Sequence, residues 1–244
     1  MNSALVDNVL IVLTCTVYVN PRKQFLHQMN PNERIQVYLK SITQWLEKTS
    51  FKICVVENSG YTFPELSDYL KMYESRFEII TFNEFTLHSK FQHLIFNFSK
   101  GASEMYSVNH ACEHTKFKDS INFLIKITGR YYVPLFENHL ISIDIKNRTR
   151  NIHTVQNENS IIGLHQNYNT ERREVCEILG IHILFFYFLF HMNLSDDSGS
   201  FFPHVETIYY NRLKSFDPNK ILSLPTFPIE PTQMGGCDVV LSEL

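Results

Sequence analysis

The sequence lacks several patterns that identify common classes of protein. It contains no Cys-x-x-Cys pair, and its five cysteines are far apart, so a zinc knuckle or a thioredoxin-like motif is unsupported. It has no cluster of basic residues and its formal net charge is −3, which argues against a protein that binds nucleic acid. Dispersed free thiols are typical of a reducing compartment. We therefore expect a cytoplasmic protein.

Long hydrophobic runs are also missing. The N-terminal apolar run follows Asp7 and has no basic region before it, so it indicates a buried strand and not a signal peptide. A second run, residues 181–190 (IHILFFYFLF), has only about half the length that a bilayer requires. We expect it to be a core element or a wall of the acceptor side. No transmembrane span is predicted, and a peripheral membrane contact is left open.

Two further motifs are absent. A Rossmann-type oxidoreductase needs a glycine-rich turn after its first strand, but residues 14–24 (TCTVYVNPRKQ) contain no glycine. His110 and His114 have the spacing of metal ligands on a helix, yet they lack the HExxH arrangement and no third ligand is evident. Neither a dinucleotide cofactor nor a zinc site is expected.

The patterns that are present predict an α/β protein. Residues 8–19 (NVLIVLTCTVYV) are almost continuously apolar and rich in β-branched side chains, which is typical of a strand buried on both faces of a parallel sheet. Residues 33–48 carry apolar side chains at helical spacing. Alternating strands and helices are expected after them at 51–60, 64–75, 77–82, 101–115 and 120–132. This order predicts an open, mostly parallel sheet flanked by helices.

Beyond residue 135 the pattern is less regular. We expect strands at 141–145 and 161–164, a helix at 170–190 with Gly180 inside it, a polar loop at 196–200 and a helix at 204–215. The remaining tail contains four prolines and the Gly235-Gly236 pair, and no regular structure is predicted there. Because no repeat or linker divides the chain, a single domain is expected.

Three polar clusters lie at or near the ends of predicted strands, at residues 14–16, 57–60 and 126–131. Ligands of open α/β sheets bind at the carboxyl ends of the strands. Each cluster also has a structural interpretation, since ENSG is a good turn sequence and threonines in a strand usually only pack. The third cluster is the most informative. Gly129 indicates a close approach of the backbone, and Arg130 offers a fork suited to a diphosphate.

Five ordered blocks resemble a known family. They are VLTCTVYV, ERIQVYLKSI, KICVVENSGY, KGASEMYSVNHA and FLIKITGRYYV, within residues 8–135. They resemble nucleotide-sugar glycosyltransferases of the GT-A fold that occur in bacterial surface-polysaccharide clusters and in large DNA viruses. KITGRYY is the most specific block, whereas Ser103 departs from the family's KGxGEA pattern.

The resemblance implies transfer of a sugar from a UDP- or GDP-linked donor to a glycan acceptor. Residues 1–135 would be the nucleotide-sugar-binding part, and residues 136–244 the acceptor-side part and tail. The nucleotide would bind at the ends of the first two strands. The sugar or diphosphate would contact the start of the helix at 101–115. The third cluster would take the place of an Asp-x-Asp metal motif. The donor-binding residues implied in this way are Thr14, Thr16, Glu57, Asn58, Lys100, Gly101, Glu104, Lys126, Thr128, Gly129 and Arg130.

The third cluster changes the expectation for a metal. An Asp-x-Asp motif would hold Mn²⁺ or Mg²⁺ against the leaving diphosphate, but this segment carries the cations Lys126 and Arg130 and no carboxylate. We expect that no metal is required, with Mn²⁺ or Mg²⁺ as the alternative.

An inverting transferase also needs a general base. Glu206 is the first candidate because it opens a late helix after a flexible loop, and Asp196 or Asp197 is the second. The alternative for Glu206 is a carboxylate that only stabilises the helix dipole. At the level of the whole protein, the alternative to a transferase is a non-catalytic nucleotide- or sugar-binding module on the same fold.

Overall fold

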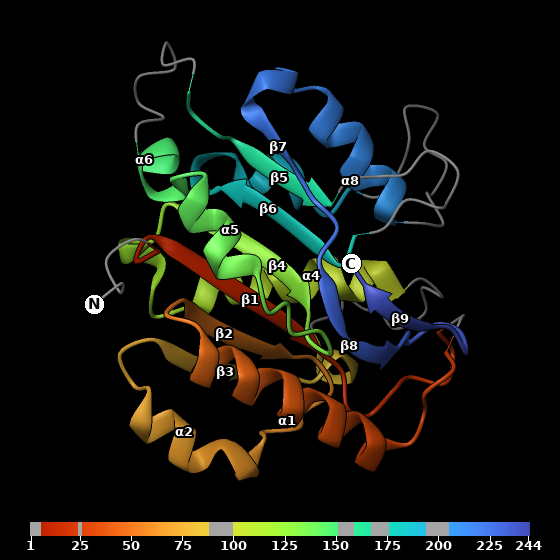
Figure 1. The fold of residues 1–244 in the computed structure, drawn as a ribbon. Coiled ribbons are helices and arrows are strands. Elements are labelled where there is room, and N and C mark those ends of the chain that lie inside the picture. The colour runs from red at the N-terminus through yellow and green to blue at the C-terminus, as the bar shows by residue number, and fades with distance from the viewer. Residues whose placement is uncertain (1–5, 24–25, 88–99, 151–158, 167–175, 194–204) are drawn as a thin grey trace.

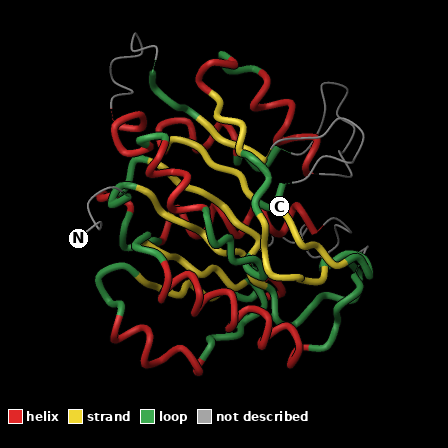
Figure 2. Tube along the Cα trace, viewed as in Figure 1, coloured by secondary structure: helices red, strands yellow, loops and turns green. Residues whose placement is uncertain are grey.

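The computed structural model describes residues 6–23, 26–87, 100–150, 159–166, 176–193 and 205–244. Its centre is a seven-stranded sheet with the strand order β3-β2-β1-β4-β6-β5-β7, and β6 is the one strand of this sheet that runs antiparallel to its neighbours. Helices cover both faces of the sheet (Figures 1 and 2). The expected fold class, an open and mostly parallel α/β sheet flanked by helices, is confirmed.

The alternation predicted for the first half of the chain is confirmed as well. Its strands are β1 (Val9–Cys15), β2 (Lys52–Glu57), β3 (Phe77–Thr81) and β4 (Phe123–Thr128). Its helices are α1 (Pro31–Lys48), α2 (Ser67–Met72) and α4 (Lys100–His114). Short 3₁₀ helices occur at Pro64–Leu66, Glu84–Thr86 and Lys118–Ser120, and later at Ile183–Phe185 and Pro218–Lys220.

Local sequence explains these elements. Every residue of β1 is buried, as expected for a strand at the centre of a sheet that is covered on both sides. Helix α1 begins at Pro31, whose missing N–H is not needed in the first turn, and the Asn30 side chain accepts a hydrogen bond from the amide of Asn32. The apolar side of α1 contributes Trp45, whose indole N–H donates to the carbonyl of Tyr131 at 2.9 Å.

Two hydrophobic layers enclose the sheet. Alternate residues of β1, β2 and β4 pack with α1, α2, α5 (Phe136–Ser142) and α6 (Ile145–Arg150) on one face. The residues between them pack with α4, α7 (Phe186–Leu189) and α8 (Val205–Lys214) on the other face (Figure 1). Each fully buried Leu, Ile or Phe side chain stabilises the fold by roughly 1.5–3 kcal/mol.

Two predictions for the second half were wrong. The strand expected at 141–145 is the end of α5 and the start of α6. The helix expected at 170–190 contains strand β6 (Ile178–His182) and the short helix α7 instead, while residues 167–175 lie outside the described residues. Gly180 lies in mid-strand, where an added Cβ would be 2.8 Å from the side chains of Leu164 and Phe123.

The C-terminal tail also differs from the prediction, because it forms three strands. β7 (Ile221–Leu224) joins the large sheet beside β5 (Gly163–Gln166), and β8 (Pro228–Gln233) pairs with β9 (Val240–Glu243) in a separate hairpin. The prolines of β8 are tolerated because a two-stranded hairpin leaves outward N–H positions unpaired. The Gly235-Gly236 pair lies between β8 and β9.

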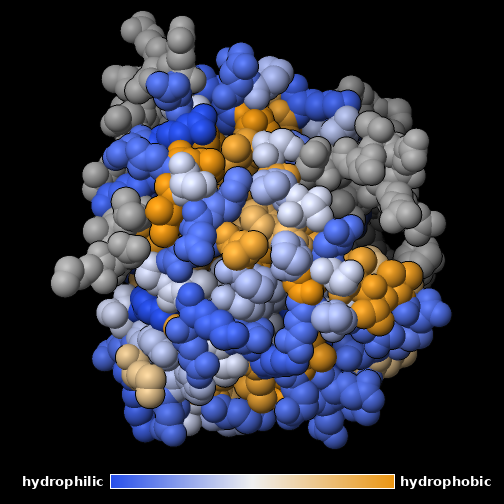
Figure 3. Space-filling model, in the orientation of Figure 1, coloured by the Kyte–Doolittle hydropathy of each residue, from blue (hydrophilic) through white to orange (hydrophobic). Residues whose placement is uncertain are grey.

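The apolar run at 181–190 is divided between core and surface. Phe186 and Phe190 are buried, whereas Tyr187 and Phe188 are 61% and 47% exposed. On the face seen in Figure 3, hydrophobic surface is broken into separate patches among hydrophilic side chains. In the part of the chain that the structure describes, no helix is both long and apolar enough to cross a bilayer. A peripheral membrane contact stays a prediction.

Candidate active site at the carboxyl ends of the strands

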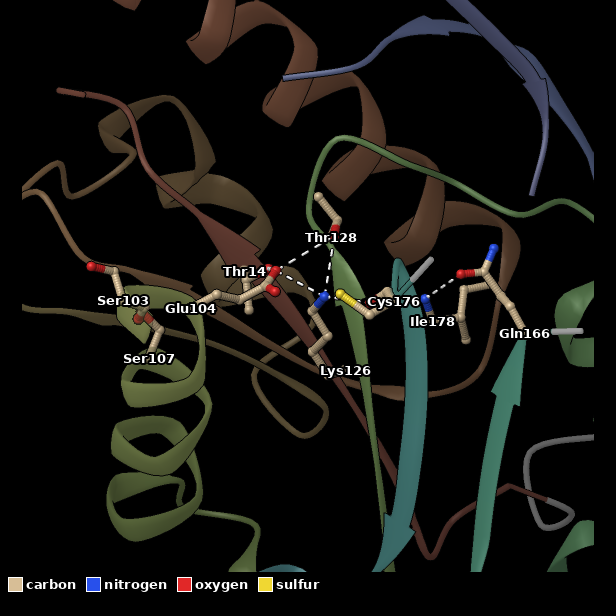
Figure 4. A network of polar contacts seen from close by, with 9 residues as sticks. All are labelled: Thr14, Ser103, Glu104, Ser107, Lys126, Thr128, Gln166, Cys176 and Ile178. Carbon is tan, nitrogen blue, oxygen red and sulfur yellow. Dashed lines mark hydrogen bonds and ion pairs between the residues drawn. The ribbon is translucent and has the colours of Figure 1, made fainter. Parts of the chain in front are cut away.

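The three polar clusters singled out in the sequence meet at one edge of the sheet. Strand β1 lies between β2 and β4, and Cys15 is in register with Glu57 while Thr14 is in register with Thr128. The carboxyl ends of the three strands are therefore adjacent. The N-terminal turn of α4 approaches the same edge and brings Glu104 to it (Figure 4).

Glu104 is the centre of the polar network at this edge. Its Oε1 atom accepts hydrogen bonds from Thr14 Oγ1 at 2.8 Å and from Thr128 Oγ1 at 3.5 Å, and forms an ion pair of 2.8 Å with Lys126 Nζ (Figure 4). Its Oε2 atom has no hydrogen-bond partner among the described residues, and the side chain is 20% exposed. The carboxylate is thus held through one oxygen while the other is able to accept a hydrogen bond from a ligand.

Lys126 is completely buried beneath this carboxylate. Besides the ion pair with Glu104, its ammonium group donates to the carbonyl of Cys176 at 2.6 Å and to Thr128 Oγ1 at 3.3 Å. Burial alone lowers the pKa of Lys126, but Glu104 and the other acidic groups nearby raise it above its ordinary value. A direct contact with a diphosphate would break these interactions. We interpret Lys126 as the residue that fixes Glu104.

Glu57, expected beside the base or ribose, is also completely buried. Its carboxylate accepts hydrogen bonds from the amides of Val17, Ser59 and Tyr61 at 2.8, 2.9 and 2.8 Å, and from the hydroxyl of Ser59. Burial raises the pKa of Glu57, although these hydrogen bonds oppose the shift. Both oxygens are occupied, so the observed role of Glu57 is to hold the loops after β1 and β2 together.

Thr16 and Asn58, which follow β1 and β2, form a hydrogen-bonded pair. Thr16 Oγ1 donates to Asn58 Oδ1 at 2.7 Å, and Asn58 Nδ2 donates to Glu84 Oε2 at 3.4 Å. Asn58 is buried, while Thr16 is half-buried. Of the two, Thr16 is the better placed to meet a nucleotide.

Gly129 follows β4 at the point where the backbone crosses close to β1. Its amide donates to the carbonyl of Thr14 at 2.9 Å. An added Cβ would lie 2.7 Å from that carbonyl oxygen and 2.5 Å from Cys15 Sγ. The close approach inferred from this glycine therefore exists, and in the structure its partner is strand β1.

This contact leads to a prediction about stability. We expect Gly129→Ala to lower the free energy of unfolding by about 1–3 kcal/mol, because the Thr14 carbonyl belongs to a central strand and cannot rotate away from the new methyl group. Urea denaturation would measure the change, with Ser142→Ala on the exposed end of α5 as a control. An unchanged unfolding midpoint would contradict the close contact between the two segments.

Arg130 and Lys100 bring positive charge to the site. Arg130 is 8% exposed and donates to Gln233 O at 3.2 Å, next to the turn of the β8–β9 hairpin. Lys100 and Gly101 begin α4. The pKa of Lys100 is lowered by partial removal from solvent and by Arg130, while Glu104 and Glu206 oppose the shift. These charged groups are thus within electrostatic reach of one another.

Glu206, the first candidate for the general base, lies half-buried in the first turn of α8, which packs against α4. The second candidates, Asp196 and Asp197, lie outside the described residues. Glu104 and Glu206 are both half-buried carboxylates.

The donor set at the end of β4 does not fit a protein-held Mg²⁺ or Mn²⁺. Such ions require several oxygen ligands, and carboxylates are the usual ones. Here Glu104 Oε1 is engaged by Lys126, and the segment after β4 supplies Thr128, Gly129 and Arg130. No group of three metal-ligating side chains occurs in the described ranges.

The sequence analysis missed three residues near the site. Cys176 and Glu177 lie just before β6, and the carbonyl of Cys176 holds Lys126. The Glu177 Oε2 atom is buried and has no partner among the described residues. Arg34 had a usable signal, because it is a cation on the apolar side of an amphipathic helix, beside Ile35 and Tyr38.

The comparisons with known proteins are weak. No protein-family profile and no curated protein matches the sequence. A protein provisionally named as a nucleotide-diphospho-sugar transferase, from Desulfovibrio desulfuricans, is similar in structure with a TM-score of 0.44 and 9% identity, over 90% of this chain and 80% of its own.

Two other solved structures give similar values. They are a cytidylyltransferase from Leptospira borgpetersenii (TM-score 0.43, 12% identity, 89% of this chain and 76% of its own) and 4-diphosphocytidyl-2C-methyl-D-erythritol synthase from Anaerococcus prevotii (0.42, 7%, 97% and 92%). At similarities this low, the matches carry no argument about activity.

Proposed function

We propose that this chain is a glycosyltransferase that takes a sugar from a UDP- or GDP-linked donor and transfers it to a glycan acceptor. The observation that carries the proposal is the position of Glu104, held at the carboxyl ends of β1 and β4 with one oxygen available and with Arg130 and Lys100 nearby. Open α/β sheets bind their ligands at this edge. The family resemblance of residues 8–135 supports the same class of reaction.

In this proposal the donor lies across the carboxyl ends of the strands. Thr16 and Asn58 meet the nucleotide, while Glu57 orders the loop that carries them. Lys100, Gly101 and Arg130 border the diphosphate. Glu104 accepts a hydrogen bond from a sugar hydroxyl through Oε2, and Thr14, Thr128 and Lys126 hold it in place. Residues 1–135 form the donor part and residues 136–244 the acceptor part.

The chemical step needs a base on the acceptor side. Glu206 takes the proton of the acceptor hydroxyl as that oxygen bonds to the anomeric carbon, and the bond from this carbon to the diphosphate oxygen breaks. Asp196 and Asp197 are the second choice. We place the reaction in the cytoplasm, where sugar nucleotides are made.

A thermal-shift panel of nucleoside diphosphates and nucleotide sugars tests the proposal. A ligand at 100 times its dissociation constant adds about 2.7 kcal/mol of apparent stability, which is readily seen as a higher melting temperature. Stabilisation by one nucleotide family would support the donor site and identify its base. No shift with any nucleotide would overturn the proposal.

The alternative is a non-catalytic module that binds a nucleotide or sugar on the same fold. The lack of an Asp-x-Asp motif after β4 favours it. Hydrolysis of the donor distinguishes a transferase from a binding module. A transferase often cleaves its nucleotide sugar slowly in the absence of an acceptor, and a binding module does not. Nucleotide binding without any release of sugar would favour the module.

The cations near the site lead to a prediction about metals. We expect turnover to persist in excess EDTA, because Arg130 and Lys100 supply the positive charge that a divalent ion would otherwise bring to the leaving diphosphate. The rate of nucleoside diphosphate release would be compared with and without the chelator. Complete loss of turnover that added Mn²⁺ restores would contradict this expectation.

A further inference from the structure

Two buried arginines meet at the edge of the candidate site. Arg34 comes from the first turn of α1 and is 6% exposed, and Arg130 follows β4 and is 8% exposed. Both guanidinium groups contact Gln28: Arg34 Nη1 donates to its backbone oxygen at 2.9 Å, and Arg130 Nη1 donates to its side-chain Oε1 at 3.4 Å. Two segments far apart in sequence thus bring like charges to one residue.

Neither arginine has an acidic partner in the described part of the chain. The ion pairs found there join Lys40 to Glu230, Lys71 to Asp68 and Lys126 to Glu104. The remaining hydrogen bonds of Arg34 go to neutral oxygens, namely the carbonyl of Thr16 and the hydroxyl of Tyr38. Buried charges in proteins are normally paired, because desolvating an uncompensated ion is costly. Two guanidinium groups that both contact Gln28 and have no acidic partner among the described residues therefore indicate a site for an anion.

The surroundings restrict what this anion is. The carbonyl of Thr16 accepts a hydrogen bond from Arg34, and its hydroxyl donates to Asn58. These residues lie at the carboxyl ends of β1 and β2, where we propose that the nucleotide binds. Both arginines lie within electrostatic reach of Lys100 at the start of α4. Glu57, a buried carboxylate after β2, accepts its hydrogen bonds from backbone amides and from Ser59. Among the described residues, Glu57 forms no ion pair with either arginine.

We propose that Arg34 and Arg130 form a two-arginine subsite that selects diphosphate-linked donors over monophosphate-linked donors. Each guanidinium is a planar fork that can bind the oxygens of one phosphate, so two forks match two linked phosphates. Until the diphosphate binds, neutral acceptors occupy the guanidinium groups, namely oxygens of Gln28, Thr16 and Tyr38 for Arg34 and oxygens of Gln28 and Gln233 for Arg130. The inference rests on the proposed function, since it assigns specificity within the same donor site.

Isothermal titration of the full chain with inorganic pyrophosphate, inorganic phosphate, UDP, GDP, UMP and GMP tests the subsite. We expect pyrophosphate to bind at least about tenfold more tightly than phosphate, and the preferred diphosphate to bind more tightly than its monophosphate by a similar factor. Arg34→Gln and Arg130→Gln are each expected to weaken pyrophosphate and diphosphate binding roughly 10- to 100-fold, with a smaller effect on the monophosphate.

Arg76→Gln is the matched control, because Arg76 is a half-buried guanidinium that donates to the carbonyls of Phe51 and Leu46 and lies over the ring of Tyr73. Gly235→Ala provides a variant that keeps both arginines. Its new methyl group would overlap the guanidinium of Arg130, whose flexible end must move, so pyrophosphate binding is expected to weaken while the fold is retained. This variant remains informative if Arg34→Gln does not fold.

The outcomes separate the inference from the proposed function. Tight pyrophosphate binding that depends on both arginines, without turnover of any nucleotide sugar, would support the anion subsite and overturn the transferase. Normal diphosphate preference in folded Arg34→Gln or Arg130→Gln protein would overturn the subsite and leave the transferase standing. Equal affinity of the wild-type protein for phosphate and pyrophosphate would also overturn it.

Discussion

Lys126→Met is expected to lower the free energy of unfolding by about 3 kcal/mol, which we place at the lower end of the range for breaking a buried ion pair because Glu104 is 20% exposed. Methionine fills the buried volume but leaves Glu104, the carbonyl of Cys176 and the hydroxyl of Thr128 without their shared donor. Urea denaturation followed by circular dichroism would measure the loss. Lys40→Met is a suitable control, since its ion pair with Glu230 is exposed and such pairs contribute about 0–1 kcal/mol.

The double variant Lys126→Met/Glu104→Gln identifies the cause of this loss. If the cost comes from an uncompensated carboxylate, removing its charge is expected to restore part of the stability. The pKa of Lys126 is raised in the folded protein, so its stabilising contribution is complete below its ordinary value of 10.5 and is lost as the pH rises through the folded value. The difference between wild type and variant should therefore persist at neutral pH. A double variant no more stable than Lys126→Met would contradict the ion-pair explanation.

The first half of the fold is predictable from sequence because its local signals agree with its tertiary environment. Strand β1 is continuously apolar and is buried on both faces. Helix α1 carries a proline and an asparagine at its start and an apolar side that packs on the sheet. Pattern, capping and burial all indicate the same structure there.

The second half was predicted less well because its local signals conflict with its surroundings. The apolar residues 178–190 have no period that distinguishes a helix from a buried strand. Strand β6 is selected by its neighbours β4 and β5, whose side chains Phe123 and Leu164 cover Gly180. The prolines of β8 argued against a strand, yet an isolated hairpin accepts them because its outer edge is unpaired.

For the candidate site, the location at the carboxyl ends of the strands was easier to predict from the sequence than the roles of the individual residues. Clusters at the ends of parallel strands must meet at one edge, and Thr14 and Thr128 do meet there, both bonded to Glu104 of α4. The role of Lys126 could not be predicted, because its partners come from α4 and from Cys176, which are far from it in sequence. A lysine in an apolar strand is more often a buried ion-pair partner than a ligand contact, since long cationic side chains are rarely buried unless paired.

Glu206→Gln carries the largest expected effect on turnover, a fall in kcat of about 10²- to 10⁴-fold, which is the usual contribution of a positioned general base. The substitution keeps the size of the side chain and its place in the first turn of α8. Melting temperature and nucleotide affinity are expected to stay close to wild type. The rate of sugar transfer to an acceptor would be measured for the variant and the wild type.

Glu104→Gln is the informative comparison for this variant. It removes the carboxylate that we assign to a sugar hydroxyl, so kcat/KM is expected to fall roughly 10- to 100-fold, the range for a hydrogen bond to a charged group. The double variant Lys126→Met/Glu104→Gln is expected to regain stability without regaining turnover, which separates the chemical role of Glu104 from its structural role.

A folded Glu206→Gln protein with normal turnover would contradict the assignment of Glu206 as the general base. Glu206 would then be a carboxylate that only interacts with the dipole of α8. The base would then have to be sought at Asp196, Asp197 or Glu104 itself.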